Sequence, residues 1–154
     1  MRKYWIYLIY ILAHKWQVFK ECFKCGLYWQ GITHDLSKFR FEEFVGYANY
    51  FYGTKTEDDI RNMDYAWLSH QRRNRHHFQW WVMMEDEGTV KILRMPERYW
   101  KEMACDWGGM SKIKNVKEWY GANRHKIILH PETRKDVEEF IKYEKPVFQR
   151  KIII

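Results

Sequence analysis

The sequence predicts an all-α fold, a helical bundle with a possible short β-hairpin near residues 80–94. Apolar residues recur at helical spacing along most of the chain, and glycine and proline stand where helices would end or begin. Residues able to bind a metal are spread over several of these predicted helices. At 154 residues, without an internal repeat or linker, the chain is expected to form one domain over residues 1–154.

The predicted helices of the N-terminal half cover residues 3–25, 33–52 and 56–73. The first stops near Gly26, a residue that suits the C-terminal end of a helix. The second has a possible break at Ser37 and ends at Gly53. Thr56 and Asp59 resemble a capping box, with Asp in place of the usual Glu or Gln, so a helix is expected to begin there.

The C-terminal half is expected to hold a hairpin of residues 80–85 and 89–94, then helices over 96–107, 115–121 and 131–144. Residues of high β propensity flank an Asp-Glu-Gly turn, which predicts the hairpin. Pro96 and Pro131 fit the first position of a helix, and Gly108-Gly109 would end the helix that carries Asp106.

The apolar segment Trp5–Ala13 follows Arg2 and Lys3, as in a signal peptide. It is far shorter than the roughly 20 residues that span a bilayer, and it is rich in tyrosine. It also runs directly into His14. We therefore expect a buried helix, and no association with a membrane.

The net charge of +7 favours an anionic small-molecule substrate, and it also allows a nucleic-acid partner. A basic surface that merely keeps the protein in solution is an equally good interpretation. The three cysteines do not resemble a secreted disulfide framework, so a reducing cytoplasm is expected. Cys22 and Cys25 lack a second cysteine pair, and core or surface thiols are favoured over a zinc site.

Five of the seven histidines and two aspartates follow the order H…HD…H…HH…D along the chain. The residues of this series are His14, His34, Asp35, His70, His76, His77 and Asp106. Neutral imidazole and carboxylate suit Mn, Fe, Zn and similar divalent ions, and one carboxylate can bridge two ions. The order therefore predicts a metal centre built on helices.

Helix geometry restricts how these residues can meet. Adjacent residues such as His34 and Asp35 point about 100° apart on a helix, so they share an ion only at a helix end or where other helices converge. His70 and His77 would be about 10 Å apart along an unbroken helix. A shared ion therefore requires the helix to break between them, and Asn74 suits a left-handed helix end.

The motif resembles the HD-domain superfamily of metal-dependent phosphohydrolases, and the resemblance runs from about residue 10 to 106. The core H…HD…D signature matches His14, His34, Asp35 and Asp106. The additional histidines resemble the two-metal members, such as HD-GYP phosphodiesterases, and also the di-iron oxygenases of the myo-inositol oxygenase type. The GYP element is absent. The strings HDLSKF, RNRHHFQWW and EMACDW also resemble a family of small phage and bacterial proteins.

The resemblance implies a phosphohydrolase with two divalent transition-metal ions, such as Mn, Fe, Co or Zn, acting on a nucleotide or cyclic nucleotide. One ion would bind His14, His34, Asp35 and Asp106, and Asp35 would bridge to a second ion held by His70, His76 and His77. Asp35 and Lys38 are the expected catalytic residues. Lys38 matches the lysine of HD-x-x-K, which faces substrate phosphate, and Arg73 is a further candidate for binding substrate.

Two other functions remain open. A mixed-valent di-iron oxygenase could use the same ligands, and redox-active iron with oxygen consumption would identify it. A basic nucleic-acid-binding or inhibitory protein could carry a vestigial site, and it would show salt-sensitive binding without metal or turnover.

Overall fold

The structure is a computed structural model, which describes residues 1–110 and 115–143. Its α-helices are α1 (Arg2–Lys24), α2 (Tyr28–Thr33), α3 (Phe41–Tyr52), α4 (Glu57–Arg73), α5 (Glu97–Gly109), α6 (Val116–Asn123) and α7 (Pro131–Phe140). The 3-10 helices are η1 (Leu36–Phe39), η2 (Phe78–Trp81) and η3 (Arg124–Lys126). Strands β1 (Val82–Met84) and β2 (Val90–Ile92) form an antiparallel hairpin. The predicted all-α fold with a short hairpin is therefore confirmed, although the strands are shorter than expected.

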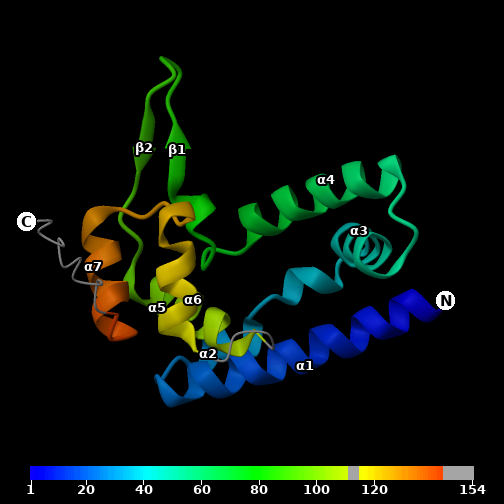
Figure 1. The fold of residues 1–154 in the computed structure, drawn as a ribbon, viewed down its shortest axis with the longest axis horizontal. Helices are drawn as coiled ribbons and strands as arrows, with labels where there is room; N and C mark the ends of the chain where they lie inside the picture. Colours follow the sequence, from blue (N-terminus) through cyan, green and yellow to red (C-terminus); the bar gives the residue numbers. More distant parts are fainter. Residues whose placement is uncertain (111–114, 144–154) are drawn as a thin grey trace, which may run out of the picture.

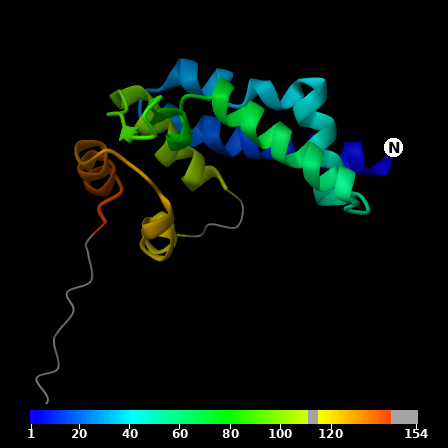
Figure 2. The ribbon, with the colours of Figure 1, turned by 90° about the horizontal axis from the view of Figure 1, so that it is seen from above.

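Figures 1 and 2 show α3 held between α1 and α4, while α5 crosses the C-terminal half of α1. The apolar core has two main parts. One contains Tyr7, Ile11, Tyr47, Ala48 and Ala66, from α1, α3 and α4. The other is built around α5, α6 and α7 and includes Trp100, Met103, Trp107, Tyr120 and Val137. Because α1 packs on both α3 and α5, it connects the two parts.

The predicted helix 33–52 is wrong in its first part. The chain forms α2, which the sequence did not indicate, then η1, and only afterwards α3. The interruption lies at Asp35, whose φ of 54° is left-handed and cannot continue a helix, and not at Ser37. The end at Gly53 is confirmed.

Helix α4 begins with the predicted capping box between Thr56 and Asp59 and ends at Arg73. The expected break at Asn74 is present, but Asn74 is extended, with φ −113°, and not left-handed. Its backbone N–H and its side-chain amide both donate to the carbonyl oxygen of His70, at 3.1 and 2.8 Å. The side chain therefore closes the helix end, so a left-handed residue is not needed.

The later helices differ from prediction at their ends. Pro96 is the N-cap of α5 and not its first helical residue, and α5 continues through Gly108 and Gly109. Pro131 does occupy the first turn of α7, as predicted. That helix stops at Phe140, and the predicted end at Glu144 lies outside the described residues.

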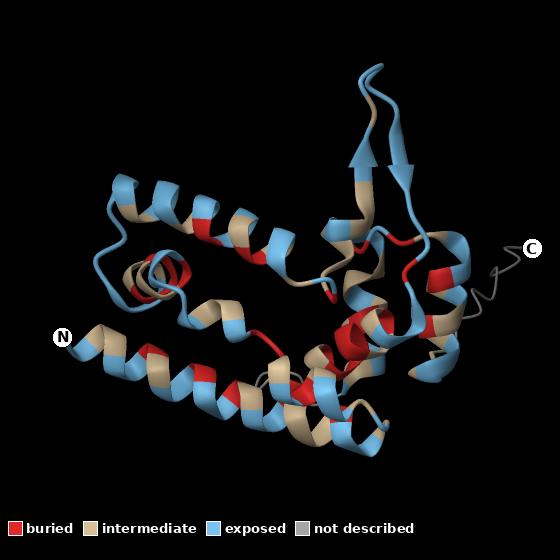
Figure 3. Cartoon of the chain, turned by 180° about the vertical axis from the view of Figure 1, so that it is seen from behind, coloured by how far each residue is buried: buried red, intermediate tan, exposed pale blue. Residues whose placement is uncertain are grey.

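Helix α1 was expected to be buried, but only one of its faces is. Tyr7, Ile11, His14, Val18 and Cys22 face the bundle, whereas the opposite face is open to solvent (Figure 3). The three cysteines are free thiols, as predicted, and Cys22 and Cys105 are buried. Across residues 1–110 and 115–143, no helix combines the length and apolarity that crossing a bilayer requires.

Gly109 permits the close approach of α5 to α1. A Cβ atom at this position would lie 2.9 Å from the backbone nitrogen of Val18, whereas a Cβ atom on Gly108 would meet only ordinary contacts, from 3.6 Å. We expect Gly109→Ala to lower the free energy of unfolding by about 1–3 kcal/mol, because the backbone of α1 must move. Gly108→Ala is the matched control. We expect it to raise the free energy of unfolding by about 0.5–1 kcal/mol, because alanine favours a helix more than glycine does. Urea unfolding followed by circular dichroism measures both, and equal effects would contradict this packing.

Candidate metal centre

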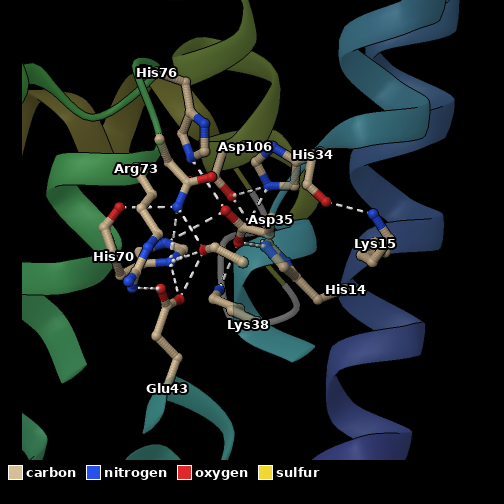
Figure 4. Close-up of polar contacts among 12 residues, drawn as sticks. His14, Lys15, His34, Asp35, Lys38, Glu43, His70, Arg73, His76 and Asp106 are labelled. Carbon is tan, nitrogen blue, oxygen red and sulfur yellow. Dashed lines mark hydrogen bonds and ion pairs between the residues drawn. The ribbon is translucent and has the colours of Figure 1, made fainter. Parts of the chain in front are cut away.

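The seven residues of the histidine–aspartate series converge on one place inside the protein. Figure 4 labels all of them except His77. His14 comes from α1, His70 from the last turn of α4, and Asp106 from α5. The other four lie at helix ends or between helices. His34 and Asp35 join α2 to η1, and His76 and His77 follow the break after α4. Segments almost a hundred residues apart in sequence thus supply one cluster.

The left-handed conformation of Asp35 allows neighbouring residues to reach the same point. His34 is the C-cap of α2, and at Asp35 the chain reverses its helical sense. Lys15 on α1 fixes this turn, because its ammonium group donates to the carbonyl oxygens of Ile32 and His34. Asp35 Oδ2 consequently lies 3.4 Å from Nε2 of His34, although the two residues are adjacent.

Oxygen Oδ2 of Asp35 faces the first group of donors. Nε2 of His14 lies 3.8 Å from this oxygen, and 3.1 Å from Oδ1 of Asp106. Nε2 of His34 lies 3.5 Å from the same Asp106 oxygen. Two imidazoles and two carboxylates therefore surround one position, and they are the four residues of the H…HD…D signature.

Oxygen Oδ1 of Asp35 faces the second group. Nε2 of His70 is 3.3 Å from it and Nε2 of His76 is 3.4 Å from it. These two histidines, His77 and Asp35 each offer a ligand atom within 4.8 Å of the others. The two oxygens of one carboxylate thus point to two separate sets of histidines, which is the arrangement of a ligand shared by two ions.

The unpartnered donors of this cluster fit a metal. Among the described residues, Nε2 of His34, His70, His76 and His77 and Oδ1 of Asp35 are buried without a hydrogen-bond partner. A buried polar atom without a partner costs about 1–3 kcal/mol. Four imidazole nitrogens and one carboxylate oxygen in one small volume are the donor types that a divalent transition metal accepts.

Two glutamates that the sequence analysis missed orient the histidines. Glu102 Oε1 accepts at 3.0 Å from Nδ1 of His34 and lies 3.2 Å from Nδ1 of His76, so it serves both groups. Glu43 Oε2 lies 2.9 Å from Nδ1 of His70. Metal-binding histidines commonly make such contacts through the nitrogen that does not bind the metal. The position of Glu102, four residues before Asp106, was a usable signal, whereas nothing in the sequence marked Glu43.

His34, His76 and Glu102 also lie close enough to form a third metal-binding group. In that group the two histidines would use Nδ1, the nitrogen already in contact with Glu102. Their Nε2 atoms would then remain buried without a partner. With one ion on either side of Asp35 and Glu102 behind the histidines, both the Nδ1 and the Nε2 atoms of His34 and His76 would have a partner. We prefer that arrangement.

The charges of the cluster favour a bound cation. Burial disfavours the charged form of His34, but Asp35, Asp106 and Glu102 outweigh burial and raise its pKa to about 10. The pKa of Asp35 lies well below its usual range, because His34 and Lys38 overcome the effect of burial. Burial and the neighbouring imidazoles lower the pKa of His77, so it stays neutral. The carboxylates are therefore anionic and ready to bind positive charge.

Lys38 and Arg73, the predicted substrate contacts, are placed differently. The ammonium group of Lys38 lies 2.6 Å from Asp35 Oδ2, inside the cluster. The guanidinium group of Arg73 lies 3.1 Å from Glu43 Oε1 and 3.6 Å from Glu42 Oε2. Arg73 therefore fixes the carboxylate behind His70, and its contact with substrate stays a prediction.

A protein-family model described as "Family of unknown function (DUF5662)" matches residues 3–143 of the chain. No curated protein and no solved structure matches this chain. The matched residues include the complete histidine–aspartate cluster and both glutamates. The resemblance to the HD-domain superfamily remains a prediction from the sequence motif.

The two donor groups predict separable losses of metal. We expect His70→Ala and His77→Ala each to lose about one ion per chain, His14→Ala to lose the other, and Asp35→Ala to lose nearly all metal. Plasma mass spectrometry of protein purified without chelator measures this. His125→Ala, an exposed histidine outside the cluster, is the control and should keep full occupancy. Full metal content in Asp35→Ala would refute the assignment.

Glu102 should control metal affinity without binding the metal. We expect Glu102→Gln to weaken metal binding by about 10–100-fold, because His34 and His76 lose the carboxylate that orients them. Competition against a chelator with a known affinity measures the change. Glu97→Gln lies on the exposed side of the same helix and should leave affinity unchanged. Equal affinities for wild type and Glu102→Gln would remove Glu102 from this role.

Proposed function

The chain belongs to the DUF5662 family, whose function is unknown, and we propose that it is a metal-dependent phosphohydrolase. The proposed substrate, judged from the histidine–aspartate cluster and its surroundings, is a nucleotide or cyclic nucleotide. The observation that carries this proposal is the position of Asp35 between two sets of histidines, with one oxygen facing each set. Two ions bound there would polarise a phosphoryl oxygen and lower the pKa of a water molecule.

The residues around Asp35 supply what phosphoryl transfer needs from a protein. Hydrolysis of a phosphate ester depends mainly on positioning and on neutralising charge. His14, His34 and Asp106 would hold one ion, and His70, His76 and His77 the other, with Asp35 common to both. Glu102 and Glu43 keep the imidazoles in place from behind. This shell is buried, so its electrostatic interactions are strong.

Lys38 is the positive group closest to the shared carboxylate. Its side chain is only 15% exposed, and its ammonium group pairs with the oxygen of Asp35 that faces the first donor group. Burial lowers the pKa of Lys38, but Asp35 and Asp106 outweigh this and raise it, so the residue stays charged. Lys38 is thus suited to neutralise a phosphate group brought to this side of the cluster.

Two partly exposed aromatic rings favour a nucleotide over a simple phosphate ester. Tyr10 stacks on His14 with a centroid distance of 6.2 Å. Trp67 stacks on His70 at 5.8 Å and meets His77 edge-on at 5.2 Å. These rings flank the two donor groups, are 42% and 36% exposed, and offer apolar surface on which a base can stack.

Removing the ammonium group of Lys38 separates substrate binding from metal binding. We expect Lys38→Ala to lose at least about tenfold in kcat/KM, since a hydrogen bond to a charged group contributes about 1.5–3 kcal/mol. Metal content should be unchanged, because ammonium is not a ligand. Lys135→Ala, on the exposed side of α7, is the control. Unaltered kcat/KM in Lys38→Ala would exclude the proposed contact.

The reaction class is tested with nucleoside triphosphates, monophosphates and cyclic dinucleotides, each with Mn, Fe or Co supplied. Release of phosphate or cleavage of a phosphodiester supports a hydrolase. Substrate-dependent oxygen uptake without hydrolysis would assign the same ligands to a di-iron oxygenase. Salt-sensitive binding of nucleic acid, without metal or turnover, would make the site vestigial.

A further inference from the structure

Helix α1 has a second apolar face, opposite the face that carries His14. Trp5 and Ile9 are each 65% exposed, and Leu12, Trp16 and Phe23 are 53–58% exposed. Surface residues of this kind are ordinary when scattered, but a continuous row of them marks an interaction site. Figure 3 shows this outer face of α1 alternating with the buried one along the whole helix.

The spacing of this face is that of a coiled coil. Trp5, Ile9, Leu12, Trp16, Phe19 and Phe23, here called the α1 seam, follow one another at alternating steps of four and three residues. Apolar residues that recur every 3.5 positions form a stripe that packs against another helix. The rings of Trp16, Phe19 and Phe23 touch in sequence, with centroid distances of 5.5 and 5.4 Å. The C-terminal half of the seam is thus continuous, with Phe19 half-buried between two exposed rings.

We propose that the α1 seam binds the α1 seam of a second copy of this chain, forming a two-fold symmetric homodimer. A seam with heptad spacing is complementary to a helix that carries the same spacing, and this chain supplies one. Two-fold dimers, in which the same patch meets itself, are the commonest soluble oligomers. The inference does not depend on the proposed hydrolase activity.

The seam is large enough for a stable dimer. Aromatic side chains bury about 150–250 Å² each, so side chains exposed to this extent offer about 100 Å² apiece. The ring of Tyr28 on α2, 54% exposed, extends the row beyond Phe23, at a centroid distance of 4.6 Å. With Ile6 and Ala13 beside the stripe, the surface approaches the roughly 800 Å² per partner of a standard interface.

An antiparallel arrangement suits both size and charge. The steps of four and three read the same in both directions, so reversing one helix matches Trp5 with Phe23, Ile9 with Phe19, and Leu12 with Trp16. Lys20, beside the seam, then lies opposite Leu8 and away from its own copy. Tryptophan and other aromatic residues are the commonest anchors of protein interfaces, and the seam has four of them.

Sedimentation velocity of the full-length protein tests this proposal over about 1–100 µM, the range of a moderately stable dimer. We expect a dimer for wild type, and a monomer for the double variant Leu12→Glu, Trp16→Glu, with dimerisation at least about 100-fold weaker. The matched control is Tyr65→Glu, a 68% exposed aromatic residue on α4 outside the seam, which should dimerise as wild type does.

The double variant should keep its helical circular dichroism spectrum and its metal content, since the seam points away from the cluster. A monomeric wild type throughout this range overturns the proposal. A dimer that persists in the double variant overturns it as well, because the interface would lie elsewhere. Monomeric wild type that sediments with phosphatidylserine vesicles, and loses this binding in the double variant, would assign the seam to a lipid surface instead.

Discussion

The placement of Asp35 is the constraint on which the centre depends. Its left-handed backbone interrupts the chain between α2 and η1, so its carboxylate does not point where a helical residue would point it. An aspartate tolerates this conformation better than a bulky or β-branched residue would. Each of its oxygens then faces a different set of histidines, which a residue within a regular helix could not achieve beside His34. The break between α2 and α3 is therefore part of the site and not a defect of the bundle.

The cluster places charged and polar side chains in the interior, where desolvation is unfavourable. Hydrogen bonds and ion pairs around the cluster offset this cost. Glu102 joins the two histidine groups through His34 and His76, and Glu43 links His70 to Arg73. These contacts satisfy the outer ring nitrogens of His34, His70 and His76, whose Nε2 atoms stay unpartnered at the centre. Metal binding to such a cluster adds directly to folding stability, because the unfolded chain has no comparable site. The proposed chemistry and the stability of the bundle thus draw on the same side chains.

Helix α1 has two roles, one for each of its faces. Its inner positions supply His14, and Lys15 beside it secures the turn that carries Asp35. Its outer positions carry the apolar seam, displaced around the helix from the first set. A helix that is apolar on both sides is ordinarily enclosed by other elements. Here the bundle covers one side of α1, and the proposed partner would cover the other.

The sequence by itself determined the helical class, the capping of α4, its end before Asn74 and the identity of the seven clustered residues. These follow from local rules, since helical periodicity, capping chemistry and donor type are properties of residues close together in the chain. Only the tertiary structure decided the left-handed turn at Asp35, the short helix α2 and the roles of Glu43 and Glu102. The ion pair between Arg73 and Glu43 was also decided there, because a guanidinium group binds whichever carboxylate the packing of α3 and α4 brings near it. Such contacts join residues tens of positions apart, and no local pattern specifies which helices will bring them together.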